Sequence, residues 1–273
     1  MPGLDGAAAA ATRAAMNAPL VFITGASSGI GQALALRFQR AGYRLALVAR
    51  RAAELQAWAD AQGFDAAGVA VYGADVRDVD AIVAAGRACL ATHGVPDVVI
   101  ASAGVSIGMD TGEFDDLDVM RATLETNTLG MAATFHPFVA PMRARRAGTL
   151  VGIASVAGIR GLPGHGAYCA SKAGVIGYCE SLRGELRDDG VKVVTIVPGY
   201  IATPLTQANP YRMPFLMPAE AFADRAFGTI VRGASYRVIP WQMAIVATLM
   251  RALPNRLFDR LARGRGRKPR RPG

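Results

Sequence analysis

Short, uninterrupted apolar runs alternate with longer amphipathic segments along most of this 273-residue chain. Strands that are buried on both faces of a parallel sheet read as continuous apolar runs, whereas half-exposed strands alternate apolar and polar residues. In the segments between the runs, apolar residues three and four apart indicate helices. The predicted strands cover residues 20–24, 45–49, 69–73, 98–102, 149–154, 192–197 and 236–239. The predicted helices between them cover residues 30–41, 52–62, 79–91, 120–145 and 167–188.

This alternation predicts an α/β fold in which a doubly wound, Rossmann-type parallel sheet of about seven strands carries helices on both faces. The chain length suits one such domain, and no linker or internal repeat divides it. We therefore expect a single domain at 19–240, a disordered leader at 1–18, a helical extension at 241–262 and a basic, disordered tail at 263–273. Met16 offers an alternative translation start within the leader.

Cysteine usage and charge narrow the class of protein further. The three Cys and three His residues show no paired spacing, so we expect no disulfide framework, no metal and a reducing, cytoplasmic environment. The net charge is +9, but from residue 251 onward nine Lys and Arg residues face the single Asp259, so the excess lies almost entirely at the C-terminal end. Few aromatic residues accompany that charge, which disfavours nucleic acid as a partner.

A glycine-rich turn with the sequence TGASSGIG directly follows the first predicted strand, at residues 24–31. Glycine permits positive φ angles and close approach of a ligand, and the next helix begins with free N–H groups and a favourable dipole. The turn therefore predicts a binding site for the phosphates of a dinucleotide cofactor. The residues that we assign to it are Gly25, Ser27, Ser28, Gly29, Ile30 and Gly31.

The end of the second predicted strand bears on the choice of cofactor. An acidic residue there usually binds the ribose 2′-hydroxyl of NAD, whereas a nearby arginine accommodates the 2′-phosphate of NADP. This chain has Arg50 and Arg51 and no carboxylate at that position. NADP(H) is therefore favoured over NAD(H), with Arg50 the better placed of the two. The alternative is that both arginines only solvate the start of the following helix.

Three residues with complementary chemistry follow in the second half of the chain. Tyr168 and Lys172 are four residues apart on a predicted helix and therefore share one face, and Ser155 precedes Tyr168 by thirteen residues at the end of a strand. A free tyrosine has a pKa of about 10, and a nearby ammonium group lowers that pKa by stabilising the phenolate. We expect Lys172 to lower the pKa of Tyr168, so that Tyr168 acts as general acid or base while Ser155 stabilises the developing oxyanion.

The glycine turn TGxxxGxG together with the Ser, Tyr and Lys residues in the spacing S-x12-Y-x3-K resembles the short-chain dehydrogenase/reductase superfamily, in its short, single-domain type. The likeness extends over residues 20–206. It implies an NADP-binding catalytic domain at 19–240 and adds Asn127 as a fourth catalytic residue, which supports a water in a proton relay. It also implies that Lys172 holds the nicotinamide ribose and that Tyr168 lies beside the cofactor.

The resemblance assigns further residues to the cofactor. It implies that Asp75 and Val76 contact the adenine, and that the segment 198–203 faces the nicotinamide carboxamide. The segment 101–104 reads Ala-Ser-Ala-Gly where the family has Asn-Asn-Ala-Gly, so side-chain hydrogen bonds from the two asparagines are lost there, while the close backbone approach is kept. The cofactor residues implied in this way are Asp75, Val76, Ala103, Gly104, Tyr168, Lys172, Pro198, Gly199, Ile201 and Thr203.

These features predict an oxidoreductase that interconverts a ketone or aldehyde with an alcohol. Residues 207–217 lie where related enzymes carry a flap over the substrate, and their Met, Phe and Pro content indicates an apolar or lipid-like small-molecule substrate. The residues expected to join the flap are Ile159, Leu162, Tyr200 and Leu205. His165 and Cys169 flank Tyr168, but we interpret them as structural. The alternative function is a catalytically idle binding or regulatory protein attached to membrane or nucleic acid through its basic tail.

The C-terminal extension allows two interpretations. Residues 241–253 form an apolar stretch too short for the roughly 20 residues that span a bilayer, and Asn255 caps a basic amphipathic helix after it. Such a segment can lie on an anionic membrane, which would give peripheral membrane contact. Alternatively, the two helices pack on the core or on a subunit partner. We expect a homo-oligomer, either a dimer or a tetramer.

Overall fold

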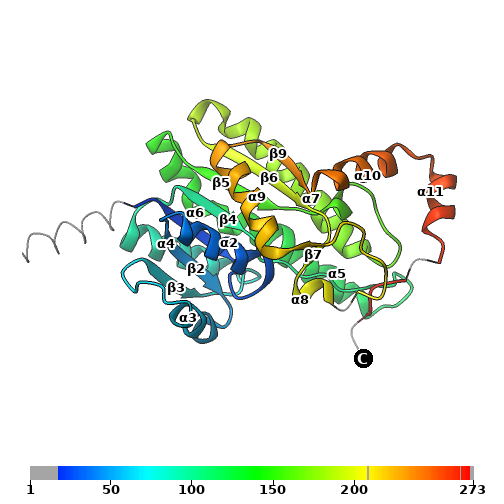
Figure 1. The fold of residues 1–273 in the computed structure, drawn as a ribbon, viewed down its shortest axis with the longest axis horizontal. Helices are drawn as coiled ribbons and strands as arrows, with labels where there is room; N and C mark the ends of the chain where they lie inside the picture. The colour runs from blue at the N-terminus through cyan, green and yellow to red at the C-terminus, as the bar shows by residue number, and fades with distance from the viewer. Residues whose placement is uncertain (1–17, 208, 265, 271–273) are drawn as a thin grey trace, which may run out of the picture.

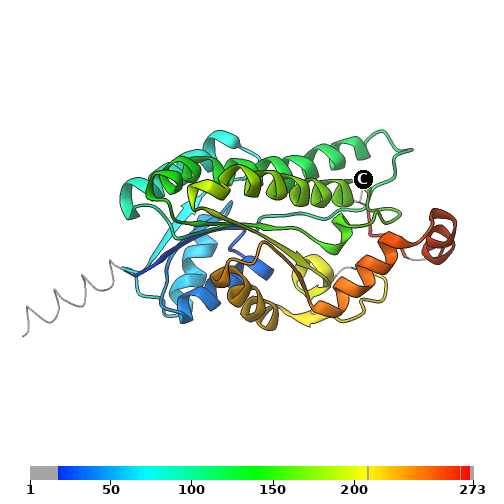
Figure 2. The ribbon, with the colours of Figure 1, turned by 90° about the horizontal axis from the view of Figure 1, so that it is seen from above.

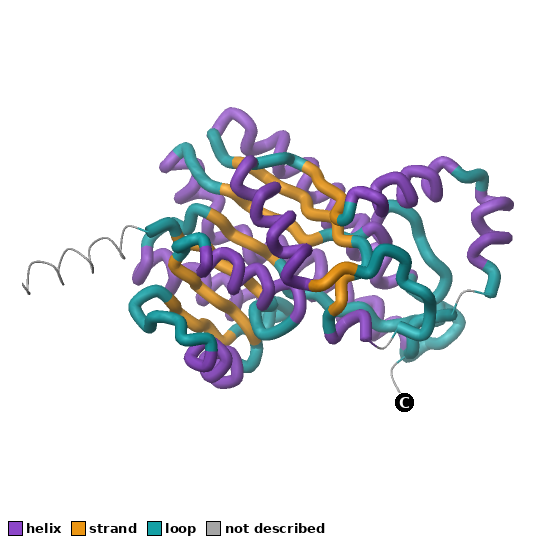
Figure 3. Tube along the Cα trace, in the orientation of Figure 1, coloured by secondary structure: helices purple, strands orange, loops and turns teal. Residues whose placement is uncertain are grey.

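The computed structural model describes residues 18–207, 209–264 and 266–270. Its centre is a seven-stranded parallel sheet with the strand order β3-β2-β1-β4-β5-β6-β9 (Figures 1 and 3). The predicted Rossmann-type doubly wound sheet is therefore confirmed, because the order reverses direction at β1. The strands are β1 (Leu20–Thr24), β2 (Arg44–Ala49), β3 (Val69–Gly73), β4 (Val98–Ala101), β5 (Thr149–Ile153), β6 (Lys192–Pro198) and β9 (Tyr236–Ile239).

Helices cover both faces of this sheet (Figure 2). One face is covered by α2 (Gly29–Arg40), α3 (Ala52–Ala61) and α9 (Ala219–Arg232). The other is covered by α4 (Val79–His93), α5 (Asp116–Leu124), α6 (Gly130–Arg145) and α7 (Gly166–Leu186). Shorter elements follow the carboxyl ends of β5 and β6: the 3-10 turn η2 (Val156–Gly158), β7 (Ile201–Ala202), α8 (Pro204–Gln207) and β8 (Met217–Pro218). A further 3-10 turn, η3 (Arg187–Asp189), ends α7.

Strand β1 shows why the predicted strands read as unbroken apolar runs. Leu20 and Phe22 point into one core cluster, and Val21 and Ile23 point into the cluster on the opposite face. All four side chains are at most 2% exposed. Because full burial of such a side chain stabilises the fold by roughly 1.5–3 kcal/mol, a polar residue would be costly at any of these four positions.

The single long helix predicted at 120–145 is divided in three. A π turn, η1 (Glu125–Leu129), separates α5 from α6. Within it, the Asn127 side chain bonds to Val105 in the loop after β4. A π turn of this kind interrupts a helix locally and often accompanies a functional residue. The break therefore follows from a contact distant in sequence, which local helical periodicity does not reveal.

The C-terminal extension folds into two helices that project from the body of the molecule, α10 (Trp241–Ala252) and α11 (Asn255–Ala262) (Figures 1 and 2). Asn255 is the first residue of α11 rather than its cap, and its side-chain oxygen accepts a hydrogen bond from Arg160 at 3.0 Å. Helix α10 exposes Trp241, Ile245 and Leu249 along one face. Contact of this extension with a membrane or with another subunit thus remains a prediction.

Of the tail expected at 263–273, the structure describes residues 263, 264 and 266–270. Residues 266–270 pack against loops at the carboxyl end of the sheet, where the Gly108 N–H donates to the Pro269 carbonyl at 3.1 Å. A Cβ at Gly108 would overlap the Lys268 carbonyl, so the approach is close. Acidic residues far away in the sequence pair with this basic segment, as Asp110 does with Arg267 and Asp116 with Arg270.

At the opposite end, the expected leader at 1–18 falls outside the described residues except for Ala18, whose carbonyl accepts a hydrogen bond from Arg44 at 3.1 Å. Among the described residues, no helix has the length and apolar character to cross a bilayer.

Candidate active site

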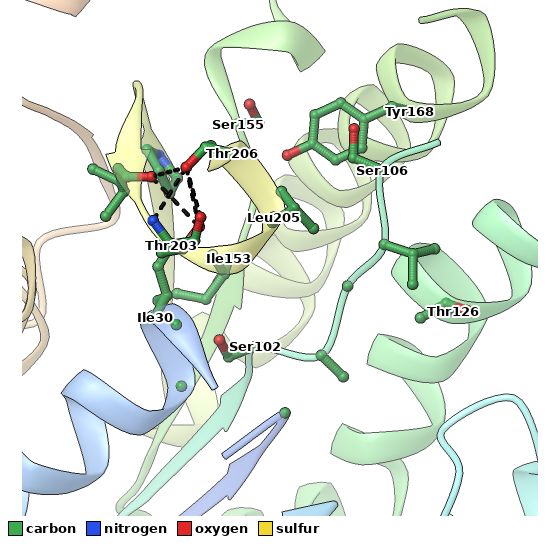
Figure 4. A pocket seen from close by; sticks show the side chains of 18 of the residues that line it. Ile30, Ser102, Ser106, Thr126, Ile153, Ser155, Tyr168, Thr203, Leu205 and Thr206 are labelled. Carbon is green, nitrogen blue, oxygen red and sulfur yellow. Dashed lines mark hydrogen bonds between the residues drawn. The ribbon is translucent and has the colours of Figure 1, made fainter. Parts of the chain in front are cut away.

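A cavity of about 280 Å³ opens at the carboxyl ends of the central strands. Its wall is formed by the turn after β1, the ends of β2 and β3, the loop after β4, the start of α7 and the segment after β6. In doubly wound sheets, ligands bind outside the carboxyl ends of the strands where the strand order reverses. The cavity therefore lies where this fold places a ligand, and it brings together predicted site residues from separate parts of the chain. Figure 4 shows part of its lining.

The glycine turn is built for close approach. Gly25 has a φ of +68°, and a Cβ there would lie 2.7 Å from the Ala103 backbone. Gly29 also has a positive φ, of +56°. A Cβ at Gly31 would overlap the Gly25 carbonyl. Side chains larger than hydrogen would therefore disrupt the turn or fill the space beside it.

Helix α2 begins at the floor of this turn without a side-chain cap from Ser28 and without an acidic residue in its first turn. Its first N–H groups therefore have no intrahelical partner, and together with the helix dipole they favour a phosphate. All six residues assigned to the turn line the cavity: Gly25, Ser27, Ser28, Gly29, Ile30 and Gly31. The residues present thus fit a dinucleotide pyrophosphate.

The two arginines after β2, Arg50 and Arg51, have different surroundings in the structure. Arg50 lines the cavity, whereas Arg51 does not appear in its wall and pairs with Glu54 on α3 at 3.1 Å. Asp75 and Val76 also line this end of the cavity. One Asp75 oxygen accepts a hydrogen bond from the Arg77 N–H at 3.0 Å. Of the two predicted 2′-phosphate ligands, the geometry favours Arg50 alone.

The loop after β4 is held from both sides. The Thr24 hydroxyl accepts a hydrogen bond from the Ser102 N–H at 3.2 Å. From the π turn, Asn127 accepts from the Val105 N–H at 2.8 Å and donates to its carbonyl at 2.9 Å. Ala103 and Gly104 line the cavity, but Asn127 is only 2% exposed and is not part of the wall. Asn127 therefore positions the cavity wall.

Ser155, Tyr168 and Lys172 meet at the centre of the cavity. Ser155 follows β5 by two residues and caps η2, where its hydroxyl accepts a hydrogen bond from the Ala157 N–H at 3.2 Å. Tyr168 lies in the first turn of α7, and its hydroxyl points toward the same space as that of Ser155 (Figure 4). Lys172 lies one turn later, with its ammonium nitrogen 5.9 Å from the centre of the Tyr168 ring. The predicted triad is thus assembled on one cavity.

Burial controls the protonation of this group. Desolvation raises the pKa of Tyr168, and hydrogen bonding with Ser155 opposes that rise in part. Desolvation also lowers the pKa of Lys172 to about 8. The expected lowering of the Tyr168 pKa by Lys172 is not seen, because the ammonium donates to the Ile153 carbonyl at 2.7 Å and burial dominates at the phenol. Tyr168 is therefore held in its protonated form.

The segment after β6 forms the next part of the wall. Pro198, Gly199, Ile201 and Thr203 all line the cavity. Thr206, which the sequence did not single out, fixes this segment: its hydroxyl donates to the Ile201 carbonyl at 2.6 Å and accepts from the Thr203 N–H at 3.1 Å (Figure 4).

The remaining wall is the expected substrate end. Leu162, Tyr200 and Leu205 line it as predicted, whereas Ile159 instead faces a groove beside α10. From the expected flap, Asn209 and Tyr211 line the cavity. Phe215 and Leu216 are about half exposed, at 49% and 47%, so most of the apolar content of the flap lies away from the cavity.

Two wall residues were missed or undervalued at this end. His165, interpreted as structural, lines the cavity and bonds through its Nε2 to the Tyr211 hydroxyl at 3.1 Å. Burial lowers the pKa of His165, and a hydrogen bond to the Pro163 backbone opposes this. Lys268 also lines the cavity, from the tail. Cys169 does not line the cavity, and its sulfur accepts a hydrogen bond from the Leu162 N–H at 3.4 Å.

Comparison with known proteins agrees with this geometry. The family described as short chain dehydrogenase matches residues 19–213. An uncharacterized oxidoreductase of Myxococcus xanthus is 41% identical over 252 residues, which cover 92% of this chain and 98% of the relative.

Two solved structures share the fold. A short chain dehydrogenase from Burkholderia cenocepacia, in complex with NADP, has a TM-score of 0.77 at 22% identity and covers 90% of this chain and 98% of its own. A short chain dehydrogenase/reductase from Burkholderia phymatum, in complex with NAD, has a TM-score of 0.77 at 23% identity, with 94% and 98% covered. Because the family matches most of the sequence and the cavity described above agrees with it, we conclude that this chain belongs to the short-chain dehydrogenase/reductase family of nucleotide-binding oxidoreductases.

Proposed function

We propose that this protein is an NADPH-dependent reductase of ketones or aldehydes with a largely apolar body. The observation that carries the proposal is the convergence of Ser155, Tyr168 and Lys172 on the same cavity as the glycine turn. A hydride donor bound along that turn and a carbonyl group beside Tyr168 would then share one enclosed space. An idle binding protein would have no need to keep this arrangement.

The cofactor preference rests on Arg50. Arg50 lines the cavity directly after β2, and neither Arg50 nor Arg51 is replaced by a carboxylate there. A planar guanidinium binds phosphate through paired hydrogen bonds, so Arg50 would hold the 2′-phosphate of NADPH. Because the similar solved structures include both an NADP complex and an NAD complex, the preference depends on this residue rather than on the fold.

When bound, NADPH supplies the hydride that reduces the carbonyl carbon. The chain's own residues handle the oxygen. Burial raises the pKa of Tyr168, so Tyr168 enters the reaction with its proton and donates it to the carbonyl oxygen as charge develops there. Ser155 donates a hydrogen bond to the same oxygen and stabilises that charge. This protonation state suits reduction better than alcohol oxidation.

Lys172 has two tasks in this scheme. Its ammonium is held by the Ile153 carbonyl, and Lys172 lines the same cavity as Tyr168, so it would hold the nicotinamide ribose of the cofactor. With a pKa of about 8, it exchanges protons readily near neutral pH and can return a proton toward the Tyr168 hydroxyl after each turnover. Asn127 supports both residues indirectly, since it fixes the neighbouring loop through Val105 and donates to the Ser171 hydroxyl on α7 at 2.9 Å.

The substrate class follows from the wall beyond Tyr168. Apolar surface is supplied there by Leu162, Tyr200, Leu205 and Tyr211. Burial of a hydrocarbon group against such surface is favourable. The test is NADPH consumption by the purified protein across ketones and aldehydes of increasing chain length, with NADH in parallel. We expect the specificity constant kcat/KM to rise with apolar length. Failure to consume either cofactor with any carbonyl compound would contradict the proposal.

A further inference from the structure

The C-terminal segment 266–270 contributes Lys268 to the wall of the cavity, at the substrate end. After α11 the chain turns back toward the loops beside α5 and α8 (Figures 1 and 2). The Gly108 N–H donates to the Pro269 carbonyl at 3.1 Å, and the Lys268 ammonium donates to the Leu205 carbonyl at 3.0 Å. The segment therefore joins the loop after β4 to the segment after β7, and both of these contribute to the cavity wall.

Ion pairs hold the segment at both ends. Arg267 pairs with Asp110 at 3.2 Å, and Arg270 pairs with Asp116 at 2.7 Å. Asp116 is only 5% exposed, and its hydrogen bond from Arg270 holds the pKa of its carboxyl below the ordinary value. Both flanking arginines of the segment thus have carboxylate partners and are occupied in anchoring it.

Lys268, between these two arginines, is in a different situation. It is only 8% exposed and lines the cavity beside His165. Within the part of the chain that the structure describes, no carboxylate lies within 4.0 Å of its ammonium nitrogen. The bond to the Leu205 carbonyl occupies one of its three N–H donors. A buried cation normally has a counter-ion, because burial of an unpaired charge is costly.

The positive charge of Lys268 affects the protonation of His165, which lines the same cavity. It contributes to lowering the pKa of His165, together with the larger effect of burial. His165 is therefore favoured in its neutral form and does not compete with Lys268 for an anion. Lys268 is the cation that this end of the cavity presents among the described residues, while the surrounding Leu162, Leu205 and Tyr211 are apolar or weakly polar.

We propose that Lys268 is a specificity-determining residue that binds an anionic group of the substrate, either a carboxylate or a phosphate. The inference rests on the proposed carbonyl reduction and refines its substrate class: a molecule with a carbonyl group, an apolar body and an anionic end. Tyr168 then acts at the carbonyl, and Lys268 supplies the charge that orients the other end. The tail accordingly belongs to the binding site.

Matched substrates test this directly. We would compare an oxo-carboxylic acid, its methyl ester and the corresponding oxo-alkyl phosphate at several chain lengths, using kcat/KM for NADPH consumption by the full-length enzyme. The variants are Lys268→Met, which removes the charge, and Lys268→Arg, which keeps it. Arg263→Met is the matched control. Arg263 is exposed at the end of α11, so this substitution removes the same charge outside the cavity.

For the wild type we expect at least one anionic substrate to be preferred over the ester by about tenfold or more, equivalent to about 1.4 kcal/mol. Lys268→Met should abolish that preference by lowering kcat/KM for the anionic substrates far more than for the ester, because only the anionic substrates lose a charged hydrogen bond. Lys268→Arg should retain it, and Arg263→Met should behave as wild type. The phosphate and carboxylate arms show which anion is bound.

A second measurement separates this inference from the proposed function. Titration calorimetry of the same acid, phosphate and ester into the NADP⁺-loaded enzyme measures binding without turnover. If no compound is reduced but an anion binds more tightly than the ester and Lys268→Met removes the difference, the anion site stands and the reduction does not. Equal affinity of the wild type for anions and ester, or a loss of NADPH affinity in Lys268→Met as large as the loss for anions, would overturn the inference.

Discussion

The amide of Asn127 holds both polar groups of the Val105 backbone: it accepts from the N–H at 2.8 Å and donates to the carbonyl at 2.9 Å. This pair of bonds connects the π turn of the α5–α6 helix to the loop that lines the cavity. A local deformation of a helix thereby sets the position of a binding-site wall. It also explains why an asparagine, with one acceptor and two donors, is suited to this position.

Replacement of Asn127 should therefore affect both stability and cofactor binding. Asn127→Ala leaves two partly buried backbone groups of Val105 without partners, which should lower the free energy of unfolding by about 1–3 kcal/mol and weaken NADPH binding. Denaturant melts and NADPH fluorescence titrations measure the two effects. Thr128→Val, in the same turn, removes only a hydroxyl bond to the Ser171 carbonyl and should leave NADPH affinity unchanged. Equal losses in both variants would contradict the positioning role.

The two arginines after β2 provide a matched pair for the cofactor. Arg50 lines the cavity, whereas Arg51 pairs with Glu54. We expect Arg50→Ala to reduce the preference for NADPH over NADH by at least about tenfold, or 1.4 kcal/mol. Arg51→Ala should change it by less than about twofold. Dissociation constants of the wild type and both variants for NADPH and NADH measure these changes. A wild type that binds NADPH and NADH equally would refute the assignment of Arg50 to the 2′-phosphate.

The buried Lys172 should appear in the pH profile. Its pKa is lowered to about 8, so its ammonium form is lost as the pH rises through that value. Tyr168, whose pKa burial raises, keeps its proton over the same range. We therefore expect kcat/KM for reduction to fall above about pH 8. Lys172→Arg retains its charge at higher pH. If this variant still binds NADPH, the fall in kcat/KM should therefore begin at a higher pH than in the wild type. A profile that stays flat through pH 10 would contradict the assigned role.

The ion pair between Arg270 and Asp116 makes the tail a structured segment. Asp116→Asn should release it, and trypsin should then cleave after Arg267 and Arg270 faster than in the wild type. Asp118→Asn is a suitable control, because Asp118 makes only a long, exposed pair with Arg121 at 3.9 Å. Time courses followed by mass spectrometry measure the difference. Equal cleavage rates in all three proteins would show that this pair does not anchor the tail.

How much the sequence predicted depended on where the interactions lie. Strand β1 agrees with its predicted bounds of 20–24, because burial on both faces gives it a continuous apolar run that is visible locally. The pairing of Arg51 with Glu54, three residues away, was also within reach of the sequence. The contact between His165 and Tyr211 joins residues 46 apart, and that between Lys268 and Leu205 joins residues 63 apart. No local pattern encodes such contacts, so the substrate end and the tail required the structure.

The central claim is that Tyr168 donates the proton during carbonyl reduction. Tyr168→Phe removes only the phenolic hydroxyl, so turnover should fall by at least about a hundredfold, as expected for loss of a general acid. The Kd for NADPH should stay within about threefold of wild type, because the ring still fills its place beside the cofactor site. The direct measurement is kcat on the best substrate from the carbonyl screen, paired with NADPH titration of the same preparation. Retention of more than about a tenth of the wild-type kcat would contradict the account.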